Sequence, residues 1–393
     1  MGSKIKIGIF FFLYLLFANT LYAQNVGGVQ SDGSKLNNIV TAVPFLLIVP
    51  QARTGAMGNA GVAILSADAN APSLNTAALA YLPKGSSGIS ISYSPWLKNL
   101  SADINLSYLS GYYRLDERNT LAASLRYFSL GNVAFLDNSM QDLGVFTPNE
   151  MAFDIDYARS FGPSFALGGS LRYIYSNLYN GQFTSGVQAR AGKAVAVDIS
   201  GIYKKDVILL GTDAVWSTGL SLSNIGTKMN YSMGGQPYYL PANLKIGTAA
   251  TLLPGQNSHF IIALDLNKLM VPTQPVYDND GKIVEGKDPN RSVPSGTFGS
   301  FSDAPGGLAE ELKETSLSIG LEYSYQQKFA LRMGYNYQHP EKGNSSYFTL
   351  GAGFAYSKLI LDLSYLAGNA RQSPLANTLR FGLQLRFGDP SQN

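Results

Sequence analysis

The sequence predicts an all-β protein, a transmembrane antiparallel β-barrel of about fourteen strands with an N-terminal plug segment. Three observations support this prediction. Segments of about 9–13 residues alternate apolar and polar side chains, close to the length that a tilted membrane strand needs. The connections between these segments alternate between short and long. The chain also starts with the features of a secretory signal.

The alternation is clearest in the last predicted strand. Its polar positions hold Arg380, Gly382, Gln384 and Arg386. Because successive side chains of a strand point to opposite faces, one face of this strand is apolar and the other carries charge. The apolar positions are Leu379, Phe381, Leu383, Leu385 and Phe387.

Segments with this alternation recur along the chain after residue 86. Strands in soluble proteins usually stop at about 5–6 residues, so strands of twice that length indicate a membrane barrel. We predict strands near 88–94, 101–115, 120–130, 151–160, 165–177, 193–204, 215–224, 243–252, 259–269, 315–326, 329–338, 347–357, 359–367 and 377–387. Tyrosines near strand ends are expected in the two aromatic girdles of such a barrel, namely Tyr108, Tyr127, Tyr157, Tyr173, Tyr323 and Tyr365.

The connections are an independent indication of the same fold. Those after even-numbered strands are short: 116–119, 161–164, 254–258, 327–328 and 357–358. Those after odd-numbered strands are longer: 131–150, 178–192, 225–242, 270–314 and 368–376. Outer-membrane barrels have short periplasmic turns and long outer loops, so we expect both chain ends in the periplasm. The longest connection, 270–314, is either a functional loop or a plain solvent loop.

The N-terminus predicts export. Lys4 and Lys6 precede an apolar run over 7–17, and the small residue Ala23 follows it. That run is shorter than the roughly 20 residues of a spanning helix. We therefore predict a cleaved signal peptide over 1–23 and localisation in the outer membrane.

Residues 24–85 do not alternate and are predicted to form a plug, the alternative being an unstructured periplasmic tail. An apolar run over 43–49 contains Pro44 and is followed by Pro50, which argues against a central strand. Glycine-spaced and helix-like stretches follow, the latter over 68–82. The predicted division is signal peptide 1–23, plug 24–85, barrel 86–387 and periplasmic tail 388–393.

Composition excludes several function classes. The chain has no cysteine, so disulfides and thiolate metal sites are excluded. Removal of residues 1–23 leaves 27 basic residues against 26 acidic ones, so nothing attracts nucleic acid in bulk. The only histidines, His259 and His339, form no recognisable catalytic spacing. We expect no catalytic residues, no metal and no cofactor, and the balance is against an enzyme.

Charged residues of both signs occupy the predicted lumenal face. They form either an ion-pair network between plug and wall or the lining of an aqueous path. These residues are Asp103, Arg126, Asp154, Asp156, Arg172, Asp198, Lys245, Asp265, Glu322, Arg332, Asp362 and Arg380.

We expect exposed aromatic residues in the predicted extracellular loops. Aromatics on loops that a rigid scaffold holds are suited to binding a partner chain, although packing among the loops would also use them. The candidate partner-binding residues are Phe135, Phe146, Tyr179, Phe183, Tyr231, Tyr238, Tyr239, Phe298 and Phe301.

The stretch Ala52-Arg53-Thr54-Gly55-Ala56-Met57-Gly58-Asn59-Ala60-Gly61-Val62-Ala63, with 68–82 after it, resembles the N-terminal region of a known barrel group. That group comprises the PorV proteins of the type IX secretion system and their FadL-like relatives. The plug residues that carry the resemblance are Arg53, Gly55, Gly58, Gly61 and Asn75. Relatives often have Asn-Pro-Ala where this chain has Asn75-Thr76-Ala77, which weakens the link to the transporter branch more than to the PorV branch.

The resemblance implies a role in protein secretion. PorV-like proteins bind the C-terminal signal domain of secreted cargo proteins, associate with the outer-membrane translocon and pass cargo to a surface attachment complex. Outer-membrane lipid is the other expected partner. Two alternatives remain, a FadL-like transporter of hydrophobic small molecules and a lipid A deacylase.

Overall fold

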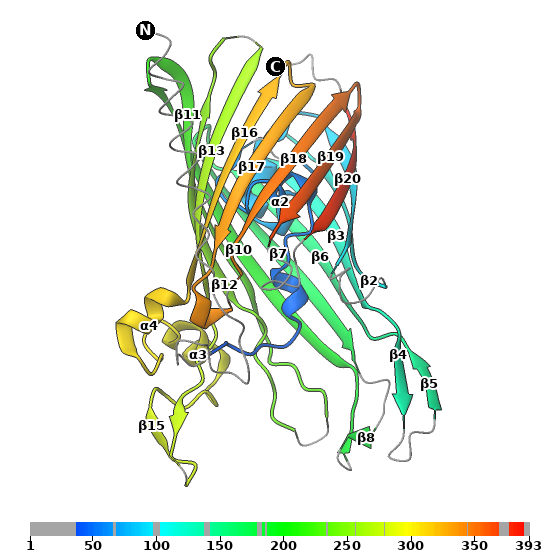
Figure 1. Cartoon of the computed structure of the whole chain (residues 1–393). Helices are drawn as coiled ribbons and strands as arrows, with labels where there is room; N and C mark the ends of the chain where they lie inside the picture. The colour runs from blue at the N-terminus through cyan, green and yellow to red at the C-terminus, as the bar shows by residue number, and fades with distance from the viewer. Residues whose placement is uncertain are drawn as a thin grey trace. The chain divides into compact units, whose positions relative to one another are not determined.

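The computed structural model describes residues 37–388 except 66–67, 97–102, 137–141, 179–182, 185–186, 233–234, 256, 279, 344 and 369–376. The predicted signal peptide over 1–23, residues 24–36 of the predicted plug and residues 389–393 of the predicted tail lie outside the described residues. The described part forms a closed antiparallel barrel, in which the first barrel strand, β1, pairs with the last, β20 (Figure 1).

Fourteen strands form the wall, and each pairs with its neighbours along the chain. Every predicted strand has a counterpart, and the largest departure is at β10, which continues to Leu209. The strands are β1 (Ser87–Pro95), β2 (Ile104–Arg114), β3 (Asn119–Leu130), β6 (Asn149–Ser160), β7 (Phe165–Asn177), β10 (Gly192–Leu209), β11 (Thr212–Gly226), β12 (Asn243–Leu252), β13 (Ser258–Leu269), β16 (Thr315–Tyr325), β17 (Phe329–Tyr337), β18 (Tyr347–Tyr356), β19 (Leu359–Ala367) and β20 (Thr378–Phe387).

The polar face of the strands points into the barrel. In β20 the side chains of Arg380 and Gln384 are buried, whereas Leu379, Phe381 and Leu383 are exposed. A water-soluble protein buries its large apolar side chains instead. An apolar exterior around a polar interior is the arrangement that a lipid bilayer requires.

Among the described residues, no helix combines the length and the apolar character needed to cross a bilayer.

The prediction that Tyr108 belongs to an aromatic girdle is wrong. Tyr108 lies on the same face of β2 as Ser110 and Tyr112, and its side chain is buried in the lumen. There its ring lies 5.6 Å from the guanidinium of Arg126. Tyr108 lies in the middle of β2, and the alternation of the strand directs its side chain inward. The other five are exposed: Tyr127, Tyr157, Tyr173, Tyr323 and Tyr365.

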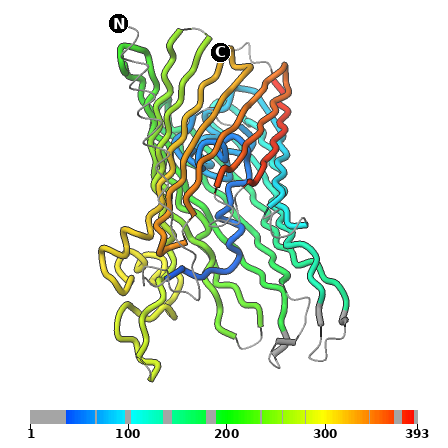
Figure 2. The backbone as a smooth tube through the Cα atoms, viewed as in Figure 1, coloured from blue at the N-terminus to red at the C-terminus, as the bar shows by residue number. Residues whose placement is uncertain are grey.

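The two ends of the barrel differ in their connections (Figures 1 and 2). At one end, here called the turn end, short turns such as 210–211 and 357–358 join the strands. At the other end, here called the loop end, the connections carry further elements. These are the hairpin strands β4 (Val133–Leu136) and β5 (Asp142–Phe146), β8 (Phe183–Thr184) and β9 (Val187–Gln188), and β14 (Val276–Tyr277) and β15 (Ile283–Glu285), with the helices α3 (Val293–Gly299), α4 (Gly307–Lys313) and η4 (Pro340–Lys342).

The described residues between 42 and 82 lie inside the barrel, drawn in blue in Figures 1 and 2. Their elements are short: η1 (Pro44–Leu47), α2 (Ala52–Gly55), η2 (Ala71–Ser73) and η3 (Thr76–Tyr81). The single helix suggested over 68–82 is therefore wrong, because Asn75 has extended backbone between η2 and η3 and caps η3 by accepting from the Ala77 N–H at 3.0 Å. The boundaries of signal peptide, plug, barrel and tail remain predictions.

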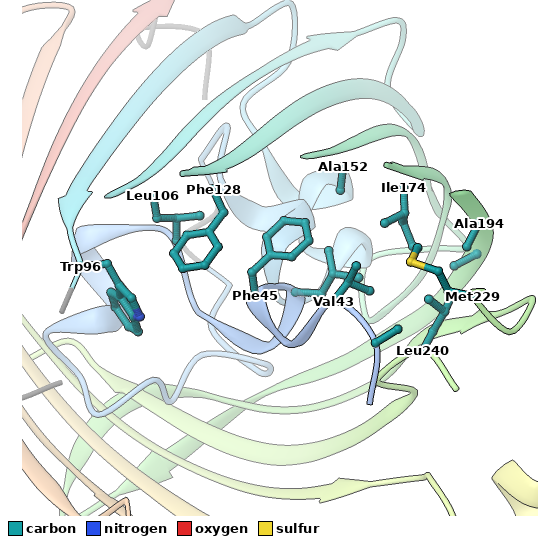
Figure 3. Close-up of a cluster of buried hydrophobic side chains, with 13 residues drawn as sticks. Val43, Phe45, Trp96, Leu106, Phe128, Ala152, Ile174, Ala194, Met229 and Leu240 are labelled. Atoms are coloured by element: carbon teal, nitrogen blue, oxygen red, sulfur yellow. The ribbon is translucent and has the colours of Figure 1, made fainter. Parts of the chain in front are cut away.

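Apolar packing joins the first part of this segment to the wall (Figure 3). Phe45 stacks parallel to Phe128 of β3, with ring centroids 6.0 Å apart. Val43 is also buried, in the same cluster as Ile174 of β7 and Met229 of the connection between β11 and β12. Burial of a side chain of this size contributes about 1.5–3 kcal/mol, so the cluster fixes the segment in place.

A buried ion-pair chain joins the segment to the opposite wall. Arg53 donates to both carboxylate oxygens of Glu322 in β16, at 2.7 and 2.9 Å. Arg332 of β17 donates to Glu322 at 2.6 Å and to Asp362 of β19 at 2.6 Å. This confirms the network expected between plug and wall. A second chain on the wall links Arg172 with Asp154 and Asp198.

We expect Glu322→Gln to destabilise the folded barrel by about 3–5 kcal/mol, because it leaves Arg53 buried beside a neutral partner. The midpoint temperature at which the compact barrel loses its fast electrophoretic migration measures this effect. Lys84→Ala is the matched control, since its ion pair with Glu117 is exposed and contributes about 0–1 kcal/mol. Equal midpoints for the two variants would contradict the anchoring role of Glu322.

Candidate functional site

Gly58 brings the plug into direct contact with the wall. Its φ is +65°, and an added Cβ would lie 2.6 Å from the backbone of Tyr335. Its N–H donates to Thr349 Oγ1 at 2.8 Å. Gly334, opposite, has no room for a side chain either, because a Cβ there would overlap the Gly58 nitrogen. Glycine at both positions allows the two backbones to meet.

The other candidate plug residues also lie in the lumen. A Cβ on Gly55 would overlap the guanidinium of Arg380, and the Gly61 N–H donates to Asp265 at 2.8 Å. Asn75 donates to the carbonyls of Val62 and Gly201 at 2.7 and 3.2 Å. Polar side chains of the wall thus satisfy backbone groups of the plug, and the Asn75 side chain of the plug satisfies a backbone carbonyl of the wall.

Cavities lie on both sides of the plug. The cavity toward the loop end has a volume of about 320 Å³, and Leu46 of the plug and Ser316 of β16 line it. The cavity toward the turn end has a volume of about 340 Å³, and Arg53 and Arg386 line it. Within the described residues, the plug therefore separates two lumenal spaces.

The longest connection, residues 270–314, is here called the loop segment; it carries β14, β15, α3 and α4 (Figure 1). Lysines of β13 and η4 form ion pairs with its acidic residues. Lys268 contacts Glu311 at 2.8 Å and Glu314 at 2.7 Å. Lys342 contacts Glu314 at 3.0 Å and Glu310 at 2.5 Å. These four contacts are buried or nearly so, and they fix α4 to the rim of the barrel.

The loop segment is also folded on itself. The Glu311 carboxylate accepts from the N–H groups of Asp303 and Ala304, at 2.7 and 3.0 Å. Asp303 in turn accepts from the Thr273 N–H at 3.3 Å and pairs with Arg291. These contacts show that the loop segment has a defined fold; whether it is functional remains a prediction.

The acidic residues of the loop segment have altered affinities for protons. Burial would raise the pKa of Glu310, but Lys342 and the Gly306 N–H hold that pKa below its usual value. Burial would likewise raise the pKa of Glu311, which the Ala304 N–H and Lys268 keep low. Asp303 shows the opposite outcome, since burial raises its pKa despite its hydrogen bonds. The two glutamates are thus held in the charged form.

The candidate partner-binding aromatics divide into separate groups. Phe298 of α3, Phe301 and Tyr238 have exposed side chains, and Phe146 is half-buried. The side chains of Phe135 in β4 and Phe183 in β8, and all of Tyr179, lie outside the described residues.

The expectation that Tyr239 is exposed is wrong. Its side chain is 9% exposed, and its hydroxyl donates to the Arg291 carbonyl at 2.6 Å. Gly296 of α3 leaves the space for its ring. Tyr231 is half-buried, and its hydroxyl donates to Ser176 at 3.0 Å. The cause in both cases is packing by residues distant in sequence.

The loop segment exposes further apolar side chains that the aromatic criterion missed. Leu308 is 75% exposed, and Leu312 shares its face of α4. Their spacing of four residues was the signal available in the sequence, because residues four apart lie on one face of a helix. Tyr277 of β14 and Val284 of β15 are exposed as well.

We expect the loop segment to loosen in acid. A carboxylate whose pKa is lowered by folding stabilises the fold above its ordinary pKa, 4.5 for Glu310 and Glu311, and loses this contribution as the pH falls further. The raised pKa of Asp303 has the opposite effect on stability, but two glutamates have lowered pKa values and one aspartate has a raised one. Hydrogen exchange at pH 6 and pH 4, corrected for intrinsic rates, should show lower protection of 270–314 at pH 4. Unchanged protection, or an equal loss in β6 and β7, would contradict the proposed cause.

Comparisons with known proteins assign the chain to a family. The family model of the type IX secretion system protein PorV matches residues 31–276, which is more than half of the chain. No curated protein matches the chain.

Solved outer-membrane barrels are similar at low sequence identity. The toluene transporter TodX of Pseudomonas putida is 14% identical, with 85% of this chain and 95% of that chain covered and a TM-score of 0.49. The toluene transporter TbuX of Ralstonia pickettii is 12% identical, covering 87% and 100%, with a TM-score of 0.49. A FadL homologue of Pseudomonas aeruginosa is 8% identical, covering 89% and 98%, with a TM-score of 0.43.

The match to the family model extends from the plug through the wall to the start of the loop segment. The chain therefore belongs to the PorV family and is an outer-membrane β-barrel of the type IX secretion system.

Proposed function

We propose that this protein binds the C-terminal signal domain of secreted cargo at its loop end and passes the cargo from the translocon to a surface attachment complex. Membership of the PorV family supports a role in this secretion system. Short turns of outer-membrane barrels face the periplasm and long loops face outward. The loop end therefore faces the cell exterior, where cargo arrives.

The anchored loop segment is the observation that carries this proposal. Buried ion pairs attach the end of α4 to the barrel. Because this attachment restrains the exposed apolar side chains before binding, little conformational freedom is lost when a partner binds. Apolar and aromatic side chains on such a base are typical of protein interfaces. The binding face comprises Tyr277, Val284, Phe298, Leu308 and Leu312.

The plug supports recognition as the mechanism. The plug separates the two lumenal cavities, so cargo does not need a path through the barrel in this proposal. Its contacts with the wall include the buried pair of Arg53 and Glu322, which opposes displacement of the plug. Cargo binding then requires no covalent step.

The transporter alternative receives less support from the lumen. Charged and amide side chains, including Arg126, Lys245 and Asn336, line the cavity at the loop end. A hydrophobic solute would have to remove water from these groups without satisfying them, which costs free energy. The lipid A deacylase alternative is separated by mass spectrometry of lipid A from cells with and without the protein.

We expect the triple variant Phe298→Ser, Leu308→Ser and Leu312→Ser to reduce cargo capture about tenfold or more, because central apolar contacts dominate interface energies. The measurement is titration of the purified full-length protein, in mild detergent, with a cargo protein that bears the signal domain. Leu210→Ser is the matched control, since Leu210 is 95% exposed at the turn end. Equal capture by the triple variant and the wild type would remove the loop segment from the binding surface.

Tyr238→Ser tests the neighbouring loop. Deletion of residues 231–239 is unsuitable, because Tyr231 and Tyr239 both pack against other elements. Tyr238 is exposed and its ring lies 6.3 Å from that of Tyr231. We expect a smaller loss of capture than in the triple variant, of about twofold to fivefold. Capture unchanged from wild type would restrict the binding face to the loop segment.

A further inference from the structure

The lumenal cavity on the loop side of the plug is built for a small ligand. Its volume of about 320 Å³ lies at the lower end of the range of small-molecule sites, about 300–1,000 Å³. Leu46 and Leu74 of the plug form its floor, and residues near the loop-side strand ends, Leu269, Ser316 and Gln338, form its rim. The cavity is therefore reached from the loop end.

The charges that line this cavity do not balance. Its acidic residues are Asp198 and Glu314, and both are already paired. Asp198 contacts Arg172 at 3.0 Å, and Glu314 contacts Lys268 and Lys342. The remaining cations of the lining are Arg126, Lys245 and Arg380. None of these three has an ion pair within the part of the chain that the structure describes.

Arg380 is the most unusual of the three. Its side chain is 2% exposed, and its Nε has no hydrogen-bond partner among the described residues. Gly55 and the ring of Trp96, 5.6 Å from the guanidinium carbon, enclose it. A buried guanidinium normally forms charge-assisted hydrogen bonds with a carboxylate or a phosphate. Arg380 therefore has donor capacity that the described protein groups leave unused.

The other two cations are placed at other points of the wall. Arg126 of β3 donates to the Leu46 carbonyl at 2.8 Å, and no carboxylate of the described residues lies at ion-pair distance from it. Lys245 of β12 lines the same cavity and has no ion pair among the described residues. In the closed strand order, two strands separate β20 from β3, four separate β3 from β12 and five separate β12 from β20, so the three cations approach the cavity from different parts of the wall. A ligand with more than one anionic group fits this arrangement.

The neutral lining indicates a water-soluble ligand. Amide and hydroxyl side chains project from several strands and can donate to or accept from the polar groups of a ligand. The amides are Asn59, Asn224, Asn243, Asn267, Asn336 and Gln338.

We propose that the loop-side lumenal cavity binds a small, water-soluble ligand with two or more carboxylate or phosphate groups, and that Arg380 and Lys245 bind these groups. Glu314 is the loop-segment residue that lines the site, and the exposed apolar side chains of that segment do not line it. The inference goes beyond cargo recognition and does not depend on it. Binding adds the missing partners of the lumenal cations without moving the plug.

Calorimetric titration of the purified full-length protein tests this site. The protein is held in a neutral maltoside detergent, and the probes are citrate and inorganic pyrophosphate, with sorbitol as the neutral probe. We expect saturable binding of at least one anion at one site per chain, no binding of sorbitol, and weaker binding as salt rises. Arg380→Met should weaken anion binding about tenfold or more, because it removes a charge-assisted contact.

Arg386→Met is the matched control, since Arg386 occupies the same face of the same strand but lines the cavity at the turn end. Lys245→Met supplies a second test should Arg380→Met fail to show the fast electrophoretic migration of the folded barrel. Both variants should lose affinity while Arg386→Met retains it. Absence of saturable binding to either anion, or equal affinities of wild type and a folded Arg380→Met or Lys245→Met protein, would overturn the proposal.

Discussion

The pairing of β1 with β20 is the contact on which the rest of the structure depends. It joins Ser87 to Phe387 and Tyr93 to Phe381, and it leaves the wall without a free strand edge. Without water in the bilayer, an open edge would leave backbone groups unsatisfied. The register also sets the faces, since a slip by one residue would turn Arg380 and Gln384 toward lipid. An arginine at the bilayer midplane costs about 2–4 kcal/mol, so the register is strongly specified.

Closure with this register creates the need for the plug. Once the polar faces of fourteen strands meet inside one cylinder, their side chains require partners. The plug supplies them with its backbone as much as with its side chains. Asp265 accepts from the N–H groups of Gly61 and Val62, and Arg126 donates to the Leu46 carbonyl. Wall and plug therefore stabilise each other, and neither set of polar groups is satisfied alone.

The strands could be predicted from the sequence because a two-residue period is local information. β10 departed from its prediction after Lys204, because Lys204, Lys205 and Asp206 end the alternation although the hairpin with β11 continues.

The candidate site was harder to predict, because its contacts join residues distant in the chain. The partner of Arg53 is 269 residues away, and residue type alone could not select Glu322 among the lumenal acids. Tyr239 is buried for the same reason, by contact with residues near α3. Exposure in a long connection depends on how that connection folds, which neither composition nor spacing encodes.

The lumenal ion pairs also explain why the cations without partners are informative. The exposed pair of Lys84 and Glu117 contributes little, since water solvates both groups whether or not they meet. Inside the barrel the balance differs, because a buried charge that lacks a partner costs several kcal/mol. Some lumenal charges avoid this cost by pairing, as Glu322 does with Arg53 and Arg332, whereas Asp156 and Arg380 have no ion pair among the described residues. Arg380 is a buried cation without a carboxylate among the described residues, and a ligand that completes its hydrogen bonds would offset the cost of burying it.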